Sequence, residues 1–253
     1  MNSSANATRP AVITGAASGI GLGVAHHLAE QGHPVTLLDQ NGQAAESAAS
    51  RLRADGAAAL ACEADVTDRT SIDKALTAAR DRFGPIQIVV TSAGIESFDP
   101  ISEITPEKWE RIIGVNLTGT FNSIQPVVPD MIAAGWGRII TISSSSAQSG
   151  APNMAHYVAS KGGVIALTKA LSYDLAPQGI TVNTIPPSII DTPMMHKATK
   201  AGDFPGAEAM APLTPVRRVG TPDDIAAACA FLCTDKAGFI TGQIIGVNGG
   251  WYM

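Results

Sequence analysis

Short, nearly uniformly apolar runs alternate along the chain with longer alanine-rich stretches of helical character. Uniformly apolar runs are typical of strands buried on both faces of a parallel sheet. We predict strands at Ala11–Thr14, Pro34–Leu38, Ala57–Glu63, Ile86–Thr91, Gly137–Ile142, Ile180–Thr184 and Gln243–Val247. We predict helices at Gly19–Gln31, Gln43–Asp55, Ser71–Phe83, Pro106–Ala134, Tyr157–Leu175 and Pro222–Leu232.

This alternation predicts an α/β fold, a doubly wound parallel sheet of about seven strands with helices on both faces. At 253 residues the chain is long enough for one large α/β domain. No change in composition and no low-complexity linker divides it. We therefore predict a single domain over residues 1–253.

Charge and composition exclude several classes of protein. The net charge is −5 and the basic residues do not cluster, so we expect no nucleic-acid partner. No apolar run approaches the roughly 20 residues of a membrane span, so we expect no membrane partner. Met1–Thr8 lacks the apolar core of a secretory signal, and three cysteines form no disulfide framework. Cys229 and Cys233 have no further ligands for a metal, and we predict a cytoplasmic protein.

A glycine-rich loop, Thr14–Gly21, joins the first strand to the first helix with the spacing G-x-x-x-G-x-G. Glycines allow a tight turn and let a phosphate approach bare N–H groups at a helix N-terminus. A mere tight turn is the alternative, but the position between strand and helix favours a phosphate site. We predict that a dinucleotide contacts Gly15, Ser18, Gly19, Ile20 and Gly21.

Asp39 ends the second strand, 24 residues after Gly15. A carboxylate at about this distance accepts hydrogen bonds from the adenosine ribose and repels a 2′-phosphate. Gln40, Asn41 and Gly42 follow, and none of them is basic. The sequence therefore favours NAD over NADP as the cofactor, with a plain turn residue as the alternative for Asp39.

Two further strand ends carry candidate cofactor contacts. Asp65, followed by Val66, would bond the adenine amino group, or alternatively cap the helix near Asp68 and Ser71. Small residues after the fourth strand would allow a close approach of the cofactor: Ser92, Ala93 and Gly94.

Tyr157 and Lys161 lie four residues apart and so share one face of a helix. A phenol is a poor base at neutral pH, and a neighbouring ammonium would lower its pKa. Ser144 lies thirteen residues before Tyr157, and a strand-to-helix return would bring the two hydroxyls together. Ser143 and Ser145 are rivals for this position. Such a group suits proton transfer at an alcohol or carbonyl oxygen, whereas the alternative is a serine-rich turn before an ordinary surface helix.

Asn116 lies in the apolar middle of the helix predicted at Pro106–Ala134. Asparagine is unfavourable inside a helix, because its amide competes for backbone hydrogen bonds. We expect that Asn116 either finds a buried partner or marks a functional kink.

Together these motifs resemble the short-chain dehydrogenase/reductase family over essentially the whole chain. The matching positions are Thr14–Gly21, Asp39, Asp65, Val66, Asn116, Ser144, Tyr157 and Lys161. The resemblance implies a Rossmann-like domain, a nicotinamide cofactor and a homotetramer. It also implies interfaces formed by the helices containing Asn116 and Tyr157 and by the C-terminal tail.

The resemblance also implies the role of each catalytic residue. Tyr157 would be the general acid/base, and Ser144 would hold the substrate oxygen. Lys161 would bond the nicotinamide ribose and lower the pKa of Tyr157. Asn116 would kink its helix and hold a water that links Lys161 to solvent.

The chain departs from the family pattern at two places. Ser92 replaces the usual asparagine, so a side-chain bond beside the cofactor is missing or replaced. Ser188 replaces the usual glycine after Pro187, which puts the local backbone in doubt, because serine does not readily adopt a positive φ. Ile190 and Thr192 still match and would meet the nicotinamide carboxamide.

Residues 193–215 resemble the substrate lid of this family, with a loosely packed pair of surface helices as the alternative. Flexible side chains there would suit an apolar or variable substrate: Met194, Met195, Phe204 and Met210. By family analogy the pocket wall includes Ile95, Glu96, Gln148 and Met154, and Glu96 would select a polar group. We expect His156 and His196 to be bystanders.

From these observations we predict an NAD-dependent oxidoreductase that interconverts a secondary alcohol and a ketone by hydride transfer. Steroid-like, aryl and hydroxyacyl compounds are the candidate substrates. The alternatives are a 3-oxoacyl thioester reductase and a non-catalytic NAD(H)-sensing protein.

Overall fold

The computed structural model of the protein describes residues 8–253. The prediction that Met1–Thr8 is not a secretory signal therefore concerns a segment that lies almost entirely outside the described residues. Six parallel strands form one sheet in the order β3-β2-β1-β4-β5-β6. The strands are β1 (Ala11–Thr14), β2 (Val35–Asp39), β3 (Ala59–Glu63), β4 (Ile88–Thr91), β5 (Gly137–Ile142) and β6 (Ile180–Ile185). The doubly wound parallel sheet and its helical layers are confirmed.

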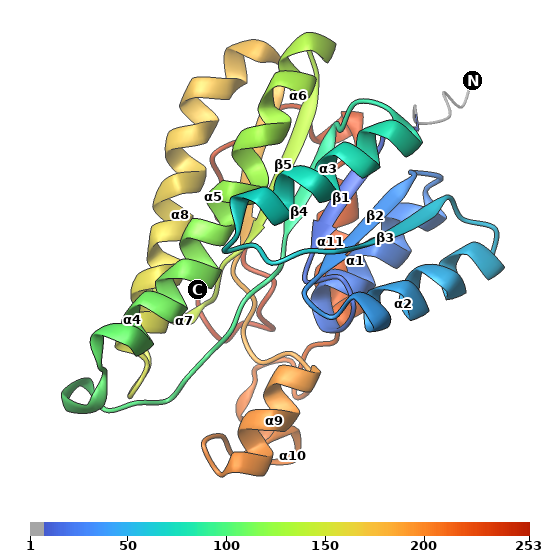
Figure 1. Ribbon diagram of the computed structural model, residues 1–253. Helices are drawn as coiled ribbons and strands as arrows, with labels where there is room; N and C mark the ends of the chain where they lie inside the picture. The colour runs from blue at the N-terminus through green and yellow to red at the C-terminus, as the bar shows by residue number, and fades with distance from the viewer. Residues whose placement is uncertain (1–7) are drawn as a thin grey trace.

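The longer helices cover the two faces of this sheet (Figure 1). They are α1 (Gly19–Glu30), α2 (Gly42–Ala54), α3 (Arg69–Phe83), α8 (Ala155–Leu175) and α11 (Pro222–Leu232). Alternate strand residues separate the two cores, because successive side chains point to opposite faces. Ile13 packs with the core that contains α1, α2 and α11, whereas Val12 packs with the core that contains α3. Among the described residues, no helix is long and apolar enough to cross a bilayer.

Strand β1 pairs with β2 on one side and with β4 on the other. The chain therefore reverses its winding direction between β1 and β4. In open parallel sheets, ligands bind outside the carboxyl ends of the strands at such a switch point. The carboxyl ends carry Thr14, Asp39 and Thr91, which places the predicted cofactor residues at one edge.

The helix predicted at Pro106–Ala134 is broken into several segments. It consists of α4 (Pro106–Ile113), a π-helical turn η2 (Gly114–Thr118), α5 (Gly119–Ile124), a 3₁₀ turn η3 (Gln125–Val127) and α6 (Val128–Ala134). The Thr105 side chain caps α4 at the Lys108 N–H. Asn116 lies in the π turn, which interrupts the regular α-helix at the position expected, and a functional kink there stays a prediction.

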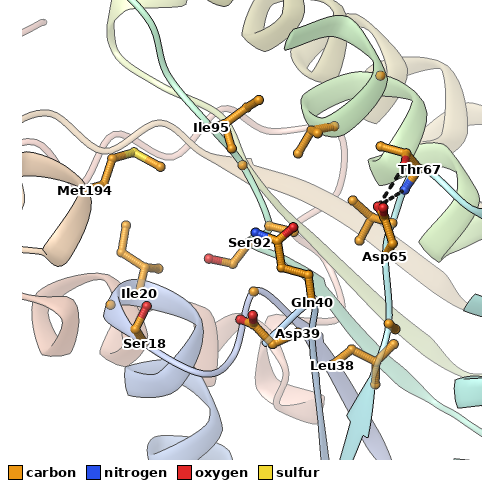
Figure 2. Close-up of a pocket in the computed structure, with 18 of the residues that line it drawn as sticks. Ser18, Ile20, Leu38, Asp39, Gln40, Asp65, Thr67, Ser92, Ile95 and Met194 are labelled. Atoms are coloured by element: carbon orange, nitrogen blue, oxygen red, sulfur yellow. Dashed lines mark hydrogen bonds between the residues drawn. The ribbon is translucent and has the colours of Figure 1, made fainter. Parts of the chain in front are cut away.

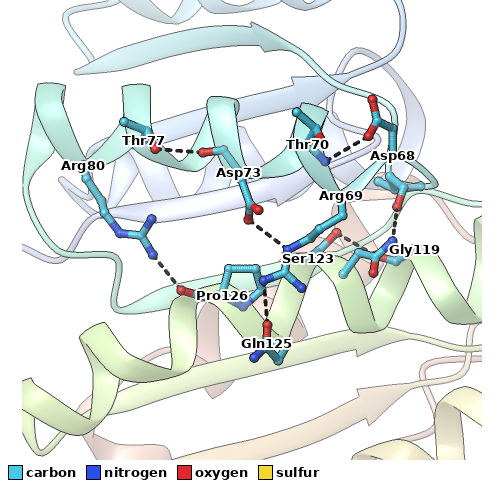
Figure 3. Close-up of polar contacts among 12 residues, drawn as sticks. Asp68, Arg69, Thr70, Asp73, Thr77, Arg80, Gly119, Ser123, Gln125 and Pro126 are labelled. Atoms are coloured by element: carbon cyan, nitrogen blue, oxygen red, sulfur yellow. Dashed lines mark hydrogen bonds and ion pairs between the residues drawn. The ribbon is translucent and has the colours of Figure 1, made fainter.

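Polar contacts from α3 hold these segments in place (Figure 3). The Arg69 guanidinium donates to Gln125 Oε1 at 2.7 Å. Arg80 donates to the Pro126 carbonyl at 2.7 Å and to Asp130 Oδ2 at 2.8 Å. These contacts fix the far end of the segmented helix against α3.

The prediction of a seventh strand at Gln243–Val247 is wrong. This segment runs beside β6 but forms only an isolated bridge between Thr184 and Ile244. Side chains form some of the hydrogen bonds that backbone groups would form in a regular β-ladder. Asn183 bonds the Ile240 carbonyl and the Gln243 N–H, and the Thr241 hydroxyl accepts from the Val182 N–H. The segment is therefore held at the sheet edge without forming a strand.

Candidate active site

A cavity of about 670 Å³ opens at the switch point between β1 and β4 (Figure 2). Most of the predicted cofactor residues line it: Gly15, Ser18, Gly19, Ile20, Asp39, Asp65, Val66, Ser92, Ala93, Gly94 and Thr192. Gly21 does not line this cavity, because it is packed beneath the loop. A Cβ at Gly21 would lie 2.3 Å from the Gly15 carbonyl oxygen.

The glycine loop is shaped by two positive φ angles, +65° at Gly15 and +53° at Gly19. A Cβ at Gly15 would lie 2.8 Å from Ala93 Cα, so a side chain there would collide with the loop after β4. The Thr14 hydroxyl accepts from the N–H groups of Ser92 and Ala93, each at 3.2 Å. The two loops are therefore fixed together and leave a bare backbone surface for a phosphate.

Asp39 lies at the end of β2 and its carboxylate faces this cavity (Figure 2). One oxygen accepts from the Ala17 N–H at 3.1 Å, and the other accepts from the Asn41 N–H at 2.9 Å. Gln40 beside it is neutral, and the only cation among the described lining residues is Arg111 on α4, next to Glu110. The glycine loop and a fixed carboxylate fit a dinucleotide whose adenosine ribose carries no 2′-phosphate.

Asp65 lines the same cavity, and one of its oxygens accepts from both the N–H and the hydroxyl of Thr67 at 2.8 Å (Figure 2). The residue that caps α3 is Asp68, which accepts from the Thr70 N–H. The capping alternative for Asp65 is therefore wrong. The contact with adenine stays a prediction.

A second cavity, of about 710 Å³, contains Ser144, Tyr157 and Lys161. The two cavities share Ile20, Ser92, Gly94, Thr192 and Met194, so they adjoin along one wall. A dinucleotide in the first cavity would therefore extend its nicotinamide end towards the second.

Ser143, Ser144 and Ser145 all line the second cavity, but only Ser144 of the three is partly exposed. Ser143 is buried and donates to the Lys161 carbonyl at 2.9 Å. Ser145 is buried, and its N–H donates to the Pro187 carbonyl at 2.8 Å. The Ser144 hydroxyl lies 2.8 Å from the Ser146 hydroxyl, and Ser144 lowers the pKa of Tyr157. Ser144 and Tyr157 therefore line the same cavity, and their direct hydrogen bond stays a prediction.

The expected lowering of the Tyr157 pKa is wrong in this structure. Burial and, to a smaller extent, the Glu96 carboxylate together raise the pKa of Tyr157 to about 12, against the opposing effect of Ser144. Lys161 Nζ lies 5.9 Å from the Tyr157 ring centroid and donates to the Ile142 carbonyl at 2.9 Å. Burial lowers the pKa of Lys161 itself to about 8, against the opposing effect of Glu96. Desolvation therefore dominates both groups.

Asn116 is fully buried and its amide is bonded on both sides. Its oxygen accepts from the Ile95 N–H at 2.9 Å, and its nitrogen donates to the Ile95 carbonyl and the Ser160 hydroxyl, both at 3.0 Å. A Cβ at Gly94 would lie 3.3 Å from both Asn116 Oδ1 and Lys161 Nζ. The expectation that Asn116 finds buried partners is confirmed, and the kink and the water relay stay predictions.

The departure at Ser188 does not disturb the backbone. Apart from glycines, Asn153 and Arg217 are the only residues in the described part of the chain with positive φ. The Ser188 hydroxyl donates to the Asn248 carbonyl at 2.9 Å and so ties this loop to the C-terminal segment. Ile190 and Thr192 line the second cavity, and the Thr192 hydroxyl caps α9 (Pro193–Ala201).

The predicted lid contains α9 and the short helix α10 (Ala207–Met210), which lie apart from the helical layers, beyond the sheet (Figure 1). The four apolar side chains expected there all line the second cavity: Met194, Met195, Phe204 and Met210. This location agrees with a substrate-facing segment, and its closure stays a prediction.

The remaining pocket predictions have mixed outcomes. Glu96 and Met154 line the second cavity, Ile95 lines the first, and Gln148 lines neither. The prediction that Gln148 lines the pocket is wrong. Gln148 lies on the short helix α7 (Ser146–Ser149), and only Ser146 and Ser149 of this helix line the cavity.

Neither histidine lines either of these two cavities, as expected. His196 pairs with Asp191 at 2.6 Å, and buried His156 lies 3.3 Å from Asp99. Two aromatic residues that were not predicted also line the second cavity, Phe98 and Trp251. Both are large side chains near glycine or proline, but nothing in their spacing marks them as pocket residues.

Comparisons with known proteins agree with this arrangement. A family profile described as enoyl-(acyl carrier protein) reductase matches residues 15–252. The chain is 38% identical over 247 residues to the 3-oxoacyl-(acyl-carrier-protein) reductase FabG of Staphylococcus aureus, covering 97% of this chain and 99% of that protein. It is 37% identical over 241 residues to the D-threitol dehydrogenase of Mycolicibacterium smegmatis, covering 95% and 92%.

A solved structure is similar in fold as well as in sequence. It is the 3-ketoacyl-(acyl-carrier-protein) reductase of Brucella melitensis, complexed with NADH. The TM-score is 0.88 at 34% identity, and the match covers 98% of this chain and 99% of the other. The likeness therefore extends over both cavities.

Proposed function

We propose, since this chain belongs to the short-chain dehydrogenase/reductase family, that it is an NAD-dependent oxidoreductase that interconverts a secondary alcohol and a ketone. The observation that carries the proposal is the second cavity, in which Ser144, Tyr157 and Lys161 lie together next to the dinucleotide cavity. A non-catalytic NAD(H)-sensing protein has no use for this group.

The cofactor supplies or accepts the hydride when it is bound. The glycine loop and Asp39 would hold it, with Lys161 beside the nicotinamide ribose. Ser144 donates a hydrogen bond to the substrate oxygen, and Tyr157 transfers a proton to or from the same oxygen. With its pKa raised to about 12, Tyr157 is a neutral phenol near pH 7, which is the form that protonates a ketone during reduction.

The choice of NAD rests on Asp39. Its two oxygens are held by backbone N–H groups at the end of the cavity, where a 2′-phosphate would meet a fixed negative charge. The NADH in the Brucella melitensis relative supports this choice.

Two substrate classes follow from the relatives. The Staphylococcus aureus relative is named as a 3-oxoacyl thioester reductase, and the Mycolicibacterium smegmatis relative as a threitol dehydrogenase. Both names support a ketone or secondary alcohol with a second oxygen nearby, and neither supports a steroid-like or aryl substrate. We therefore propose a 3-oxoacyl thioester or a polyol as the substrate.

A substrate panel tests this function. The purified chain would be assayed with NADH and 3-oxoacyl thioesters, and with NAD and polyols, steroid alcohols and aryl alcohols, by following NADH absorbance. We expect turnover with the thioester or polyol class, and faster turnover with NADH than with NADPH. No change in absorbance with any of these substrates would contradict the proposal.

We also propose a cytoplasmic homotetramer in which residues 193–215 close over the substrate. Exposed apolar side chains support the assembly: Tyr173 on α8, and Trp251, Tyr252 and Met253 in the C-terminal tail. Burying such side chains against another copy would remove them from water.

A further inference from the structure

Glu96 is a carboxylate in the substrate cavity that the reaction described above does not use. It lies in the loop after β4 and lines the same cavity as Tyr157 and Lys161. It is half-buried and forms no hydrogen bond or ion pair with any other residue in the described range 8–253. Its charge raises the pKa of both Tyr157 and Lys161, so it acts directly on the reacting groups.

The loop is fixed on the N-terminal side of Glu96. Both the N–H and the carbonyl of Ile95 are bonded to the buried Asn116 amide, at 2.9 and 3.0 Å. A backbone held at both polar groups has little freedom to swing. The backbone that precedes Glu96 is therefore held by the π turn.

The loop is fixed on the C-terminal side by Asp99. The Asp99 N–H donates to the Asn153 carbonyl at 2.7 Å. Its buried carboxylate accepts from Ser97 and Lys108 and lies 3.3 Å from His156. Glu96 is thus held between two anchored residues and is preorganised for a substrate group.

A half-buried carboxylate without a protein partner gains most from a hydrogen-bond donor. The two proposed substrate classes differ here, because a polyol carries hydroxyl donors next to the reacting carbon. A 3-oxoacyl thioester presents only a carbonyl acceptor beside the reacting ketone, and an acceptor is repelled by a carboxylate.

Two cations already act on Glu96. Burial is the largest influence and raises the pKa of Glu96, Lys161 opposes it, and the smaller effects of Asp203 and Lys197 raise and lower the pKa respectively. A cationic substrate group would meet Lys161 beside the reacting centre. A neutral hydroxyl avoids this repulsion and still donates to Glu96. The cavity is also lined by the polar residues Ser146, Ser149 and Asn153.

We infer that Glu96 is a specificity-determining residue that selects substrates with a hydroxyl on the carbon next to the reacting one. These are vicinal diols in the oxidative direction and α-hydroxyketones in the reductive direction. The inference rests on the proposed alcohol–ketone interconversion and assigns its substrate class.

The test compares butane-2,3-diol with butan-2-ol in NAD-dependent oxidation. We expect the wild-type protein to favour the diol in kcat/KM by about tenfold to a hundredfold, the factor that a hydrogen bond to a charged group contributes. Glu96→Met keeps the side-chain length without an acceptor and should bring the ratio near one. Glu96→Gln keeps an uncharged acceptor and should restore part of the preference. Glu103→Gln, at an exposed carboxylate of the same loop, should leave the ratio unchanged.

A pH profile separates this role from a merely structural one. Since the Glu96 charge raises the pKa of Tyr157, its removal lowers that pKa. Oxidation needs the phenolate. In Glu96→Met and Glu96→Gln, the pH at which the oxidation rate rises should therefore be lower than in the wild-type protein. In Glu103→Gln the profile should match that of the wild-type protein.

The outcomes distinguish this inference from the proposed function. An unchanged diol preference in both Glu96 variants would overturn the inference and leave the proposed function standing. If the wild-type protein reduces 3-oxoacyl thioesters but shows no preference for the diol, the inference is also overturned and the proposed function still stands. Absence of turnover with every compound would overturn both.

Discussion

Single residues take their chemistry from neighbours that are far away in the sequence. The spacing from Tyr157 predicted Ser144, but only the structure shows that Ser143 and Ser145 are buried and that the Ser143 hydroxyl is bonded to the Lys161 carbonyl. The direction of the Tyr157 pKa could not be predicted from Lys161 alone. Burial and the Glu96 charge both depend on how the loop after β4 meets α8.

The cofactor preference is a residue-scale prediction. Replacing Asp39 by Ala and Gln40 by Arg removes a fixed negative charge and adds a positive one. We expect the kcat/KM ratio of NADPH to NADH to rise at least about tenfold, equivalent to about 1.4 kcal/mol. Steady-state kinetics with both cofactors measure the ratio. Asp55→Ala, at an exposed carboxylate beyond α2, is the control, and an unchanged ratio in the double variant would refute the role of Asp39.

Elements were predicted best where the apolar pattern is long and their ends are capped. Strand β5 and helix α11 match their predicted bounds, and α11 begins at the capping box of Thr221 and Asp224. The segmented helix α4–α6 was predicted as one element, because apolar periodicity does not report a single inserted residue. Its π turn was signalled only by Asn116, whose amide is committed to Ile95 and Ser160.

The π turn provides a prediction at the scale of elements. Asn116→Ala removes three buried hydrogen bonds and leaves the Ile95 N–H and carbonyl without this partner. We expect the free energy of unfolding to fall by about 2–4 kcal/mol in urea denaturation, with a loss of activity. Asn122→Ala removes one hydrogen bond, to the Val66 carbonyl. It should lower the free energy of unfolding by about 1 kcal/mol, with activity retained. Equal effects of the two substitutions would contradict the role of the turn.

For the whole molecule, the alternation of strands and helices was enough to predict a doubly wound parallel sheet. The strand order was not, because the apolar pattern does not say which strands pair. That order places the carboxyl ends of β1 and β4 side by side and brings the two cavities together. The segment after Thr241 was mistaken for a strand, because an apolar run does not show that Asn183 and Thr241 side chains replace ladder bonds.

The whole arrangement is tested most directly by Tyr157→Phe, which removes one hydroxyl and keeps the ring. Turnover of the best substrate and the affinity for NADH would be measured on the same preparations of wild-type and variant protein. We predict that kcat falls by about 10²–10⁴-fold, the usual contribution of general acid–base catalysis, while the affinity for NADH stays nearly unchanged. Wild-type turnover in the variant would contradict the assignment of Tyr157 and, with it, the proposed mechanism.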